Sequence, residues 1–209
     1  MMIKAKHNNF IVKFFDWYIS KIIRSDFSEF KYDNNFIFDK NKSILLIANH
    51  FSWWDGFFAY YLNLKLFKKN FHVMMLEKEL EKRKVFSAIG AFSINPKSEN
   101  TKESLDYTIQ LLENANNLIL LFPQGKIESN YLDEINFRKG IEYITNNSKQ
   151  ELQTIFSVNF IDYINKRKPT IYNYLKLLNL NNSNNLDFIQ KEYNDYYQLV
   201  KQEQTKIWI

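Results

Sequence analysis

The sequence predicts an α/β protein with a mixed, largely parallel β-sheet flanked by helices. Short apolar runs of strand length recur along the chain, at Ile44–Ala48, Phe71–Leu76 and Leu118–Phe122. Segments with helical periodicity, such as Phe57–Leu66 and Ser98–Asn114, separate these runs. Apolar strands that alternate with helices are typical of a sheet that is covered on both faces.

The composition fits a folded domain and excludes several kinds of chemistry. The chain has 209 residues, of which 45% are hydrophobic and 24% charged, so there is enough apolar material for a sizeable core. It contains no cysteine, which excludes disulfides and thiolate catalysis. The formal net charge of +5 suits an anionic membrane surface, a nucleic acid or an acidic cofactor equally well. We expect an N-terminal amphipathic helical element over residues 1–30 and an α/β domain over residues 31–209.

The first expected element is a helix over Phe10–Arg24 with an unusually wide apolar surface. At about 100° per residue, its polar side chains form one narrow stripe, and apolar side chains cover nearly everything else. Two interpretations follow: a well-buried helix, or an interfacial helix with Trp17 and Tyr18 at headgroup depth. No secretory signal and no run of about 18 apolar residues is visible, so no transmembrane helix is expected. The stripe consists of Lys13, Asp16, Ser20 and Arg24.

Turn residues and apolar periodicity define the remaining elements. A strand at Phe36–Phe38 is expected to lead through a turn at Lys40–Lys42 into the first apolar run. A charged helix over Glu77–Ile89 is expected to end at Gly90, which suits a C-cap. Further strands are expected at Phe92–Ile94, Thr154–Ile161 and Thr170–Leu175, and further helices at Phe137–Thr145 and from Leu186 onward. The last helix places Leu186, Ile189, Tyr193, Tyr197 and Val200 on one side.

The segment Asn49–Asp55 directly follows a buried strand and carries the first candidate site. Ligands of α/β sheets bind at the carboxyl ends of strands. His50 and Asp55 can meet across the turn that starts a helix, so that the carboxylate orients the imidazole and the second ring nitrogen accepts a proton from a hydroxyl. Asn49 and Ser52 can brace the loop. The alternative is a helix N-cap beside an incidental histidine.

Two further segments combine glycine with polar or basic residues. Phe122–Ser129 also follows a buried strand, and its Pro–x–Gly turn is expected to expose backbone N–H groups that stabilise an oxyanion. Phe137–Gly140 offers a basic pair to the anionic groups of a ligand. Taken alone, Phe122–Ser129 is also consistent with an ordinary turn, and Phe137–Gly140 is also consistent with a solvated helix start. The candidate binding residues in these segments are Phe122, Pro123, Gln124, Gly125, Lys126, Arg138 and Lys139.

Together these segments resemble the glycerolipid (lysophospholipid) acyltransferases, of the 1-acylglycerol-3-phosphate acyltransferase type. Asn49–Asp55 resembles their His-x-x-x-x-Asp motif, and Gly90–Ile94 resembles their second block. Phe122–Ser129 resembles their Phe-Pro-Glu-Gly-Thr-Arg-Ser block, and Phe137–Gly140 resembles the segment that follows it. The first motif alone is weak, but order and spacing agree over roughly residues 44–160.

The resemblance implies O-acyl transfer in which His50 deprotonates the acceptor hydroxyl and Asp55 orients the imidazole. It implies acyl-CoA or acyl-carrier protein as the donor, a lipid-like acceptor, and no covalent acyl-enzyme. No metal and no resident cofactor are implied. It further implies an N-terminal helix seated on the membrane, a role that suits Phe10–Arg24, and hence a peripheral protein on the cytoplasmic face.

Several positions depart from the family pattern. Phosphate-binding members usually have arginine at the end of the second block, where this chain has Asn95. In the third block, Gln124 replaces glutamate, Lys126 replaces threonine and Ile127 replaces arginine. Neither asparagine nor isoleucine supplies the bidentate fork of arginine, and Lys126 or Lys97 can compensate only as point charges. We therefore predict an acceptor other than plain lysophosphatidic acid, such as a lyso-aminolipid, a glycolipid or a glycosylated terpenoid.

Other functional classes remain open. A non-catalytic membrane-surface or lipid-binding protein on the same fold is consistent with the altered third block. A nucleic-acid-binding module lacks a recognised motif and a stripe of charge, so no nucleic acid is expected as a partner. A serine hydrolase lacks the Gly-x-Ser-x-Gly elbow. His72 lies within an apolar strand and is expected to be structural.

Overall fold

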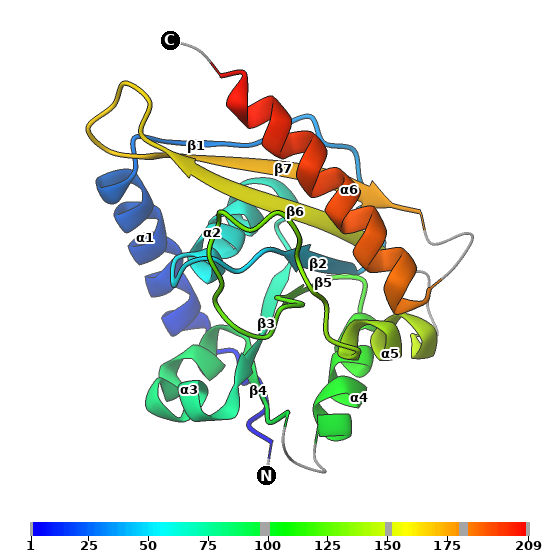
Figure 1. Cartoon of the computed structure of the whole chain (residues 1–209). Helices are drawn as coiled ribbons and strands as arrows, with labels where there is room; N and C mark the ends of the chain where they lie inside the picture. The colour runs from blue at the N-terminus through cyan, green and yellow to red at the C-terminus, as the bar shows by residue number, and fades with distance from the viewer. Residues whose placement is uncertain (1, 97–100, 149–151, 180–183, 208–209) are drawn as a thin grey trace.

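The computed structural model of the chain describes residues 2–96, 101–148, 152–179 and 184–207. These residues form three layers, in which helices cover both faces of a single sheet (Figure 1). The predicted fold class, a mixed and largely parallel sheet flanked by helices, is confirmed. Within the described ranges, no helix combines the length and the apolarity needed to cross a membrane.

The sheet has the strand order β1-β7-β6-β2-β5-β3-β4. Neighbouring strands run parallel, except that β6 and β7 form an antiparallel hairpin. β2 lies between β5 and β6, and every one of its residues is buried because both of its faces are covered. The strands are β1 (Glu29–Lys31), β2 (Ile44–Ala48), β3 (Asn70–Leu76), β4 (Ala91–Ile94), β5 (Asn117–Leu121), β6 (Gln153–Asp162) and β7 (Thr170–Leu178).

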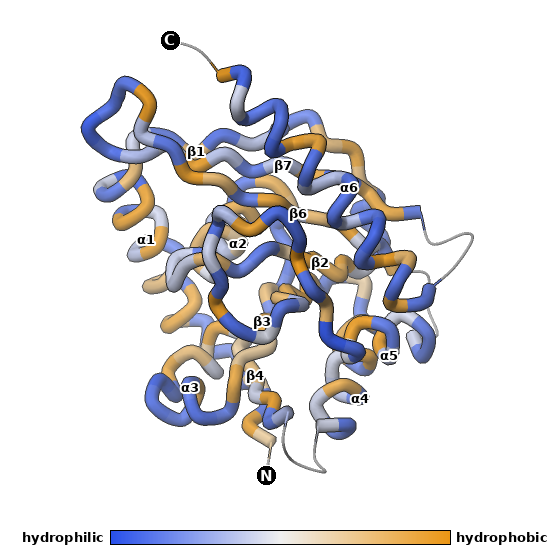
Figure 2. Tube along the Cα trace, in the orientation of Figure 1, coloured by the Kyte–Doolittle hydropathy of each residue, from blue (hydrophilic) through white to orange (hydrophobic). Residues whose placement is uncertain are grey.

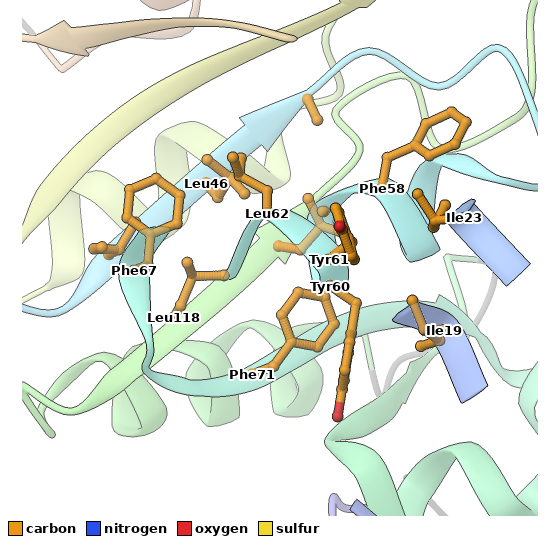
Figure 3. Close-up of a cluster of buried hydrophobic side chains, with 14 of the residues drawn as sticks. Ile19, Ile23, Leu46, Phe58, Tyr60, Tyr61, Leu62, Phe67, Phe71 and Leu118 are labelled. Carbon is orange, nitrogen blue, oxygen red and sulfur yellow. The ribbon is translucent and has the colours of Figure 1, made fainter. Parts of the chain in front are cut away.

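The helices form two groups on opposite faces of the sheet (Figure 1). On one face, α1 and α2 enclose a core that includes Ile19, Phe58 and Leu46 (Figure 3). On the other face, α4, α5 and α6 pack around the fully buried Tyr193 and Tyr197. The helices are α1 (Asn9–Asp26), α2 (Asp55–Leu62) with a π-helical extension η1 (Asn63–Phe67), α3 (Glu77–Lys82), the 3-10 helix η2 (Lys84–Ile89), α4 (Thr101–Leu112), α5 (Gly140–Asn147) and α6 (Leu186–Thr205).

Hydropathy follows this layering, because the central strands are mainly apolar and much of α6 is polar (Figure 2). The buried side of α6 agrees with the prediction: Leu186 is half-buried, and Ile189, Tyr193, Tyr197 and Val200 are buried. Helical periodicity was therefore sufficient to identify the packed face of this helix.

The predicted strand Phe36–Phe38 is wrong, and an unpredicted strand, β1, forms instead at the edge of the sheet. The side chain of Gln153 accepts the N–H of Asp39 and donates to its carbonyl, both at 2.7 Å. The backbone at the end of this segment is thus hydrogen-bonded to a side chain and not to a neighbouring strand. The predicted turn after it is present, since Lys42 N–H donates to the Asp39 carbonyl at 3.3 Å.

Two predicted helices have different bounds in the structure. The helix predicted over Glu77–Ile89 breaks at Arg83 into α3 and η2, and Gly90 (φ 103°) caps it at the predicted place. The helix predicted from Phe137 begins only at α5, because Gln190 of α6 accepts the Phe137 N–H at 2.6 Å and ties that residue to a different element. The strand predicted over Ile44–Ala48 has its predicted bounds, and the other predicted elements are present with shifted ends. The start of the helix predicted from residue 98 lies outside the described residues.

The apolar surface of α1 is only partly buried. Phe15, Ile19 and Ile23 pack into the core, whereas Phe10 (88% exposed) and Trp17 (57% exposed) project outward. The interpretation of this segment as a well-buried helix is therefore wrong.

Candidate active site

His50 and Asp55 meet at the carboxyl end of the central strand β2. The strand ends at Ala48, and a short turn leads to Asp55, the first residue of α2. Nδ1 of His50 lies 2.8 Å from Oδ2 of Asp55. The same oxygen accepts the main-chain N–H groups of Phe51 at 2.7 Å and Ser52 at 2.8 Å. Three donors on one oxygen hold the carboxylate rigidly beside the imidazole.

The two members of this pair differ in their exposure. Asp55 is fully buried, whereas the His50 side chain is 20% exposed. Burial raises the pKa of Asp55, and its hydrogen bonds with His50, Ser52 and Phe51 oppose that shift. The bond at Nδ1 leaves Nε2 of the imidazole to meet a ligand. The arrangement is that of an orienting carboxylate behind an accessible base.

The loop that follows β5 lies against His50. The ring of Phe122 stacks on the imidazole, with centroids 4.1 Å apart and an interplanar angle of 15°. Gly125 then adopts φ 66°, and its N–H donates to the Phe122 carbonyl at 3.1 Å. This N–H closes the turn, and the prediction that the turn presents N–H groups to an oxyanion stays a prediction for the other residues of the loop.

Gln124 points inward and holds the main chain of His50. Its Oε1 accepts the His50 N–H at 2.6 Å, and its Nε2 donates to Oε2 of Glu128 at 2.9 Å. The N–H of Glu128 donates in turn to the His50 carbonyl at 2.9 Å. Because Gln124 is only 4% exposed, its side chain supports the histidine and is not presented to a ligand.

Glu128 is a site residue that the sequence analysis missed. Its Oε1 lies 2.8 Å from Nζ of Lys126. Hydrogen bonds from Lys126 and then Gln124 lower the pKa of Glu128, so its carboxylate is charged at neutral pH. The available signal was a pair of opposite charges at positions 126 and 128, directly after the glycine turn.

Arg138 and Lys139 are both exposed; Arg138 crosses the glycine turn, and Lys139 directly precedes α5. Nε of Arg138 donates to the Gln124 carbonyl at 3.0 Å, and its main-chain N–H donates to the Pro123 carbonyl at 2.9 Å. A Cβ at Gly125 would lie 2.4 Å from Nε of Arg138. The glycine is therefore required both for its positive φ and for the close approach of this guanidinium.

Asn49 and Ser52 brace the loop. The side chain of the buried Asn49 accepts the main-chain N–H of Asn159 at 2.8 Å and donates to its carbonyl at 3.0 Å, which ties β2 to β6. Oγ of Ser52 accepts the N–H of Trp54 at 3.1 Å. Both side chains thus stabilise the turn that carries His50, and neither belongs to the described cavity wall.

A cavity of about 520 Å³ opens beside the imidazole. Its wall comes largely from β3, β4 and the helices around them, and most of its side chains are apolar. A chamber of this kind beside a base suits a ligand with a long apolar part. Among the predicted site residues, His50, Phe122, Pro123, Gly125, Lys126 and Arg138 line it. Apolar wall residues include Phe57, Val73, Met75, Phe86, Ile94 and Ile141.

The positions that lack the family's arginines contribute no cation to the site. Nδ2 of Asn95 donates to Oε2 of Glu77 at 2.8 Å, and Ile127 lines the cavity with an apolar side chain. Lys97, the other suggested point charge, lies outside the described residues. In the part of the chain that the structure describes, no three acidic or histidine side chains gather as a metal site.

Comparisons with known proteins address the family and the fold. A family profile described as "Acyltransferase" matches residues 29–158. The fold is similar to the crystal structure of the 1-acyl-sn-glycerophosphate (LPA) acyltransferase PlsC from Thermotoga maritima, with a TM-score of 0.62 and 11% sequence identity over 96% of this chain and 82% of that chain. At this identity the likeness concerns the fold alone. A search of curated proteins finds no match.

Proposed function

The chain belongs to the acyltransferase family, as its motifs predicted, and from that premise we propose that it moves a fatty acyl group from an acyl thioester to the hydroxyl of a lipid-like acceptor. The observation that carries this proposal is the His50–Asp55 pair, joined at 2.8 Å beside an apolar cavity. The donor is acyl-CoA or acyl-carrier protein, as the family resemblance implies.

The proposed chemistry uses His50 as a general base. Its Nε2 takes the proton of the acceptor hydroxyl while the hydroxyl oxygen attacks the thioester carbonyl carbon. The tetrahedral intermediate then collapses, the carbon–sulfur bond breaks, and the imidazolium returns the proton to the leaving thiolate. Asp55 holds the imidazole in the required tautomer and stabilises its cationic form. No nucleophilic side chain of the protein is needed, because the acceptor attacks directly.

The acyl chain is assigned to the apolar wall of the cavity. Phe57 and Phe86 come from the α2 side of the sheet, and Met75 and Ile94 come from β3 and β4. Transferring apolar surface from water to such a wall contributes roughly 25 cal/mol per Å². This contribution supports binding of a long-chain donor rather than a short, polar one.

The acceptor is proposed to differ from plain lysophosphatidic acid. Arginine is absent at Asn95 and Ile127, and both side chains have roles that do not involve an anion: Asn95 bonds Glu77, and Ile127 adds apolar surface to the cavity. Without a bidentate guanidinium at these positions, recognition of a phosphate relies on Lys126 and Arg138. Comparing turnover of lysophosphatidic acid with a lyso-aminolipid tests this, and a clear preference for the former would contradict it.

Membrane attachment is proposed to occur through α1. Phe10, Phe14 and Trp17 are exposed on this helix, which matches an interfacial helix that inserts aromatic side chains between lipids. Phe15 packs against Phe86, a cavity residue, with ring centroids 6.0 Å apart. Because of this contact, binding of α1 to a bilayer would place the cavity close to the lipid that supplies the acceptor.

The test of the reaction uses a radiolabelled acyl thioester, total lipid extract and purified protein. Wild type is expected to form a labelled lipid with acyl-CoA or acyl-carrier protein, and His50→Ala is expected to form none. His7→Asn is a matched control, because His7 contacts the Phe71 carbonyl at 3.0 Å and is not part of the described cavity wall. Equal product from wild type and His50→Ala would refute the assignment of the base.

A second candidate function is a non-catalytic lipid-binding protein on the same fold. The observation that favours it is the ion pair between Lys126 and Glu128. This pair gives the cation of the segment Phe122–Ser129 a partner within the protein, so the cation is less available to a substrate. This alternative predicts no product from folded protein with either donor. It also predicts that His50→Ala binds lipid vesicles as tightly as wild type does.

A further inference from the structure

The charged side chains around the cavity are mostly paired with one another. Of the described residues that line it, Glu79, Arg83, Lys126 and Arg138 carry charge. Nη1 of Arg83 lies 2.7 Å from Oε2 of Glu79, and Nζ of Lys126 lies 2.8 Å from Oε1 of Glu128. A cation that already has a carboxylate partner offers a weaker field to a second anion.

Glu128 is tied to the proposed catalytic histidine from two directions. Its main-chain N–H donates to the His50 carbonyl, and its carboxylate accepts from Gln124, whose Oε1 in turn binds the His50 N–H. Its side chain is only 17% exposed. The charge of Arg138 also favours the ionised form of this carboxylate, so one negative charge acts on both cations of this loop region.

We propose that Glu128 is a specificity-determining residue that sets the headgroup class of the acceptor. By neutralising Lys126, which lines the same cavity as His50, it selects lipid alcohols whose headgroup carries no net charge and disfavours phosphomonoesters. This inference rests on the proposed function, because it concerns the acceptor of that reaction.

The physical reason is competition for one ammonium group. A phosphomonoester carries a charge of about −1.5 to −2 near neutral pH. To bind Lys126 it must displace Glu128, which leaves a charged carboxylate without its partner, or join it, which places two anions side by side. A zwitterionic headgroup avoids both costs, since it brings no net charge to the pair of Lys126 and Glu128.

The variant Glu128→Gln removes the charge and retains the geometry. A glutamine at this position still offers an oxygen to Nε2 of Gln124, and its main-chain N–H still binds the His50 carbonyl. Lys126 then loses its internal partner. The double variant Lys126→Met/Glu128→Gln removes the freed cation as well. Glu192→Gln is the matched control, because it breaks an ion pair of 2.9 Å with Lys176 away from the described cavity wall.

The experiment measures kcat/KM for lysophosphatidic acid and for its zwitterionic ethanolamine ester in the same micelles with one labelled thioester. Wild type is expected to prefer the ethanolamine ester. Glu128→Gln is expected to shift the ratio about threefold toward lysophosphatidic acid, since Lys126 gains a free charge that its 65% exposure partly screens. The double variant is expected to return toward the wild-type ratio, and Glu192→Gln is expected to keep it.

The possible failures are distinguishable. A wild type that prefers lysophosphatidic acid, or an active Glu128→Gln protein with an unchanged ratio, would overturn the role of Glu128 while leaving acyl transfer intact. A ratio that shifts equally in Glu192→Gln would also overturn it. Absence of product from every protein, with these acceptors and with total lipid extract, would overturn the proposed function and this inference with it.

Discussion

Replacing Asp55 by asparagine tests whether the carboxylate, and not merely the turn, makes His50 a base. Asparagine is nearly isosteric, and its Oδ1 can still accept the main-chain N–H groups of Phe51 and Ser52, which now bind Oδ2 at 2.7 and 2.8 Å. Because Oδ2 also lies 2.8 Å from Nδ1 of His50, an asparagine oxygen in its place would keep that contact too, and the substitution removes only the negative charge. The imidazole would keep its hydrogen on Nδ1, but the cation that forms when Nε2 takes a proton would lose the carboxylate that stabilises it.

The size of the effect follows from the geometry of the pair. Nδ1 and Oδ2 lie 2.8 Å apart, which corresponds to about 4 Å between the centres of charge once His50 is protonated. With an effective dielectric constant of about 20, the attraction is ~4 kcal/mol. This attraction acts when His50 holds the proton in the transition state, so its loss is expected to slow turnover about a thousandfold.

The assay is the initial rate of labelled lipid formation at saturating thioester, with thermal unfolding as a check on the fold. Asp106→Asn is a matched control, because Asp106 also accepts one aromatic side-chain donor, the Tyr143 hydroxyl at 2.7 Å, and it lies outside the described cavity wall. This control is expected to retain nearly full activity. A folded Asp55→Asn protein with more than about a tenth of wild-type activity would refute the reasoning.

Three further predictions concern stability. Burial, and then the charge of His7, lower the pKa of His72 to about 4, so the folded state resists protonation. Because an unfolded histidine binds its proton near pH 6.5, the unfolding free energy should fall by up to about 3 kcal/mol between pH ~6.5 and ~4, as urea titrations of wild type and His72→Gln would show. Gly125→Ala should cost about 1–2 kcal/mol in urea unfolding, since it places a side chain at φ 66° and against the arginine that crosses the turn. Asn49→Ala leaves the N–H and carbonyl of Asn159 unpaired in the core and should cost about 2–4 kcal/mol by the same measurement.

Each stability prediction has a control. The pH effect should largely disappear in His72→Gln, and an equal loss in both proteins would contradict its origin in this histidine. Gly56→Ala is the control for the glycine turn, because a Cβ at that helical position meets no atom within 4 Å and should be tolerated. Asn147→Ala removes an exposed hydrogen bond on α5 and should change stability by less than about 0.5 kcal/mol.

The central strands could be predicted because their signal is local. β2 matches the apolar run Ile44–Ala48 residue for residue, and β5 differs from its predicted run by one position at each end. Burial on both faces removes polar residues from such strands, and this leaves a pattern that any short window of sequence reveals. The meeting of His50 and Asp55 was predictable for the same reason, because both lie in a single turn at the end of β2.

Tertiary structure alone decided the order of the strands and the contacts that the segment Phe122–Ser129 makes with His50. β1 is three residues long and forms because it pairs with β7. Phe36–Phe38 is not a strand, and the side chain of Gln153 binds the backbone of the adjoining Asp39. Gln124 reaches His50 across 74 positions of sequence, and Glu128 joins this contact through the same loop. These bonds depend on β5 lying directly beside β2. Hydrophobic periodicity does not predict this, since it specifies which face of a strand is buried but not which strand lies next to it.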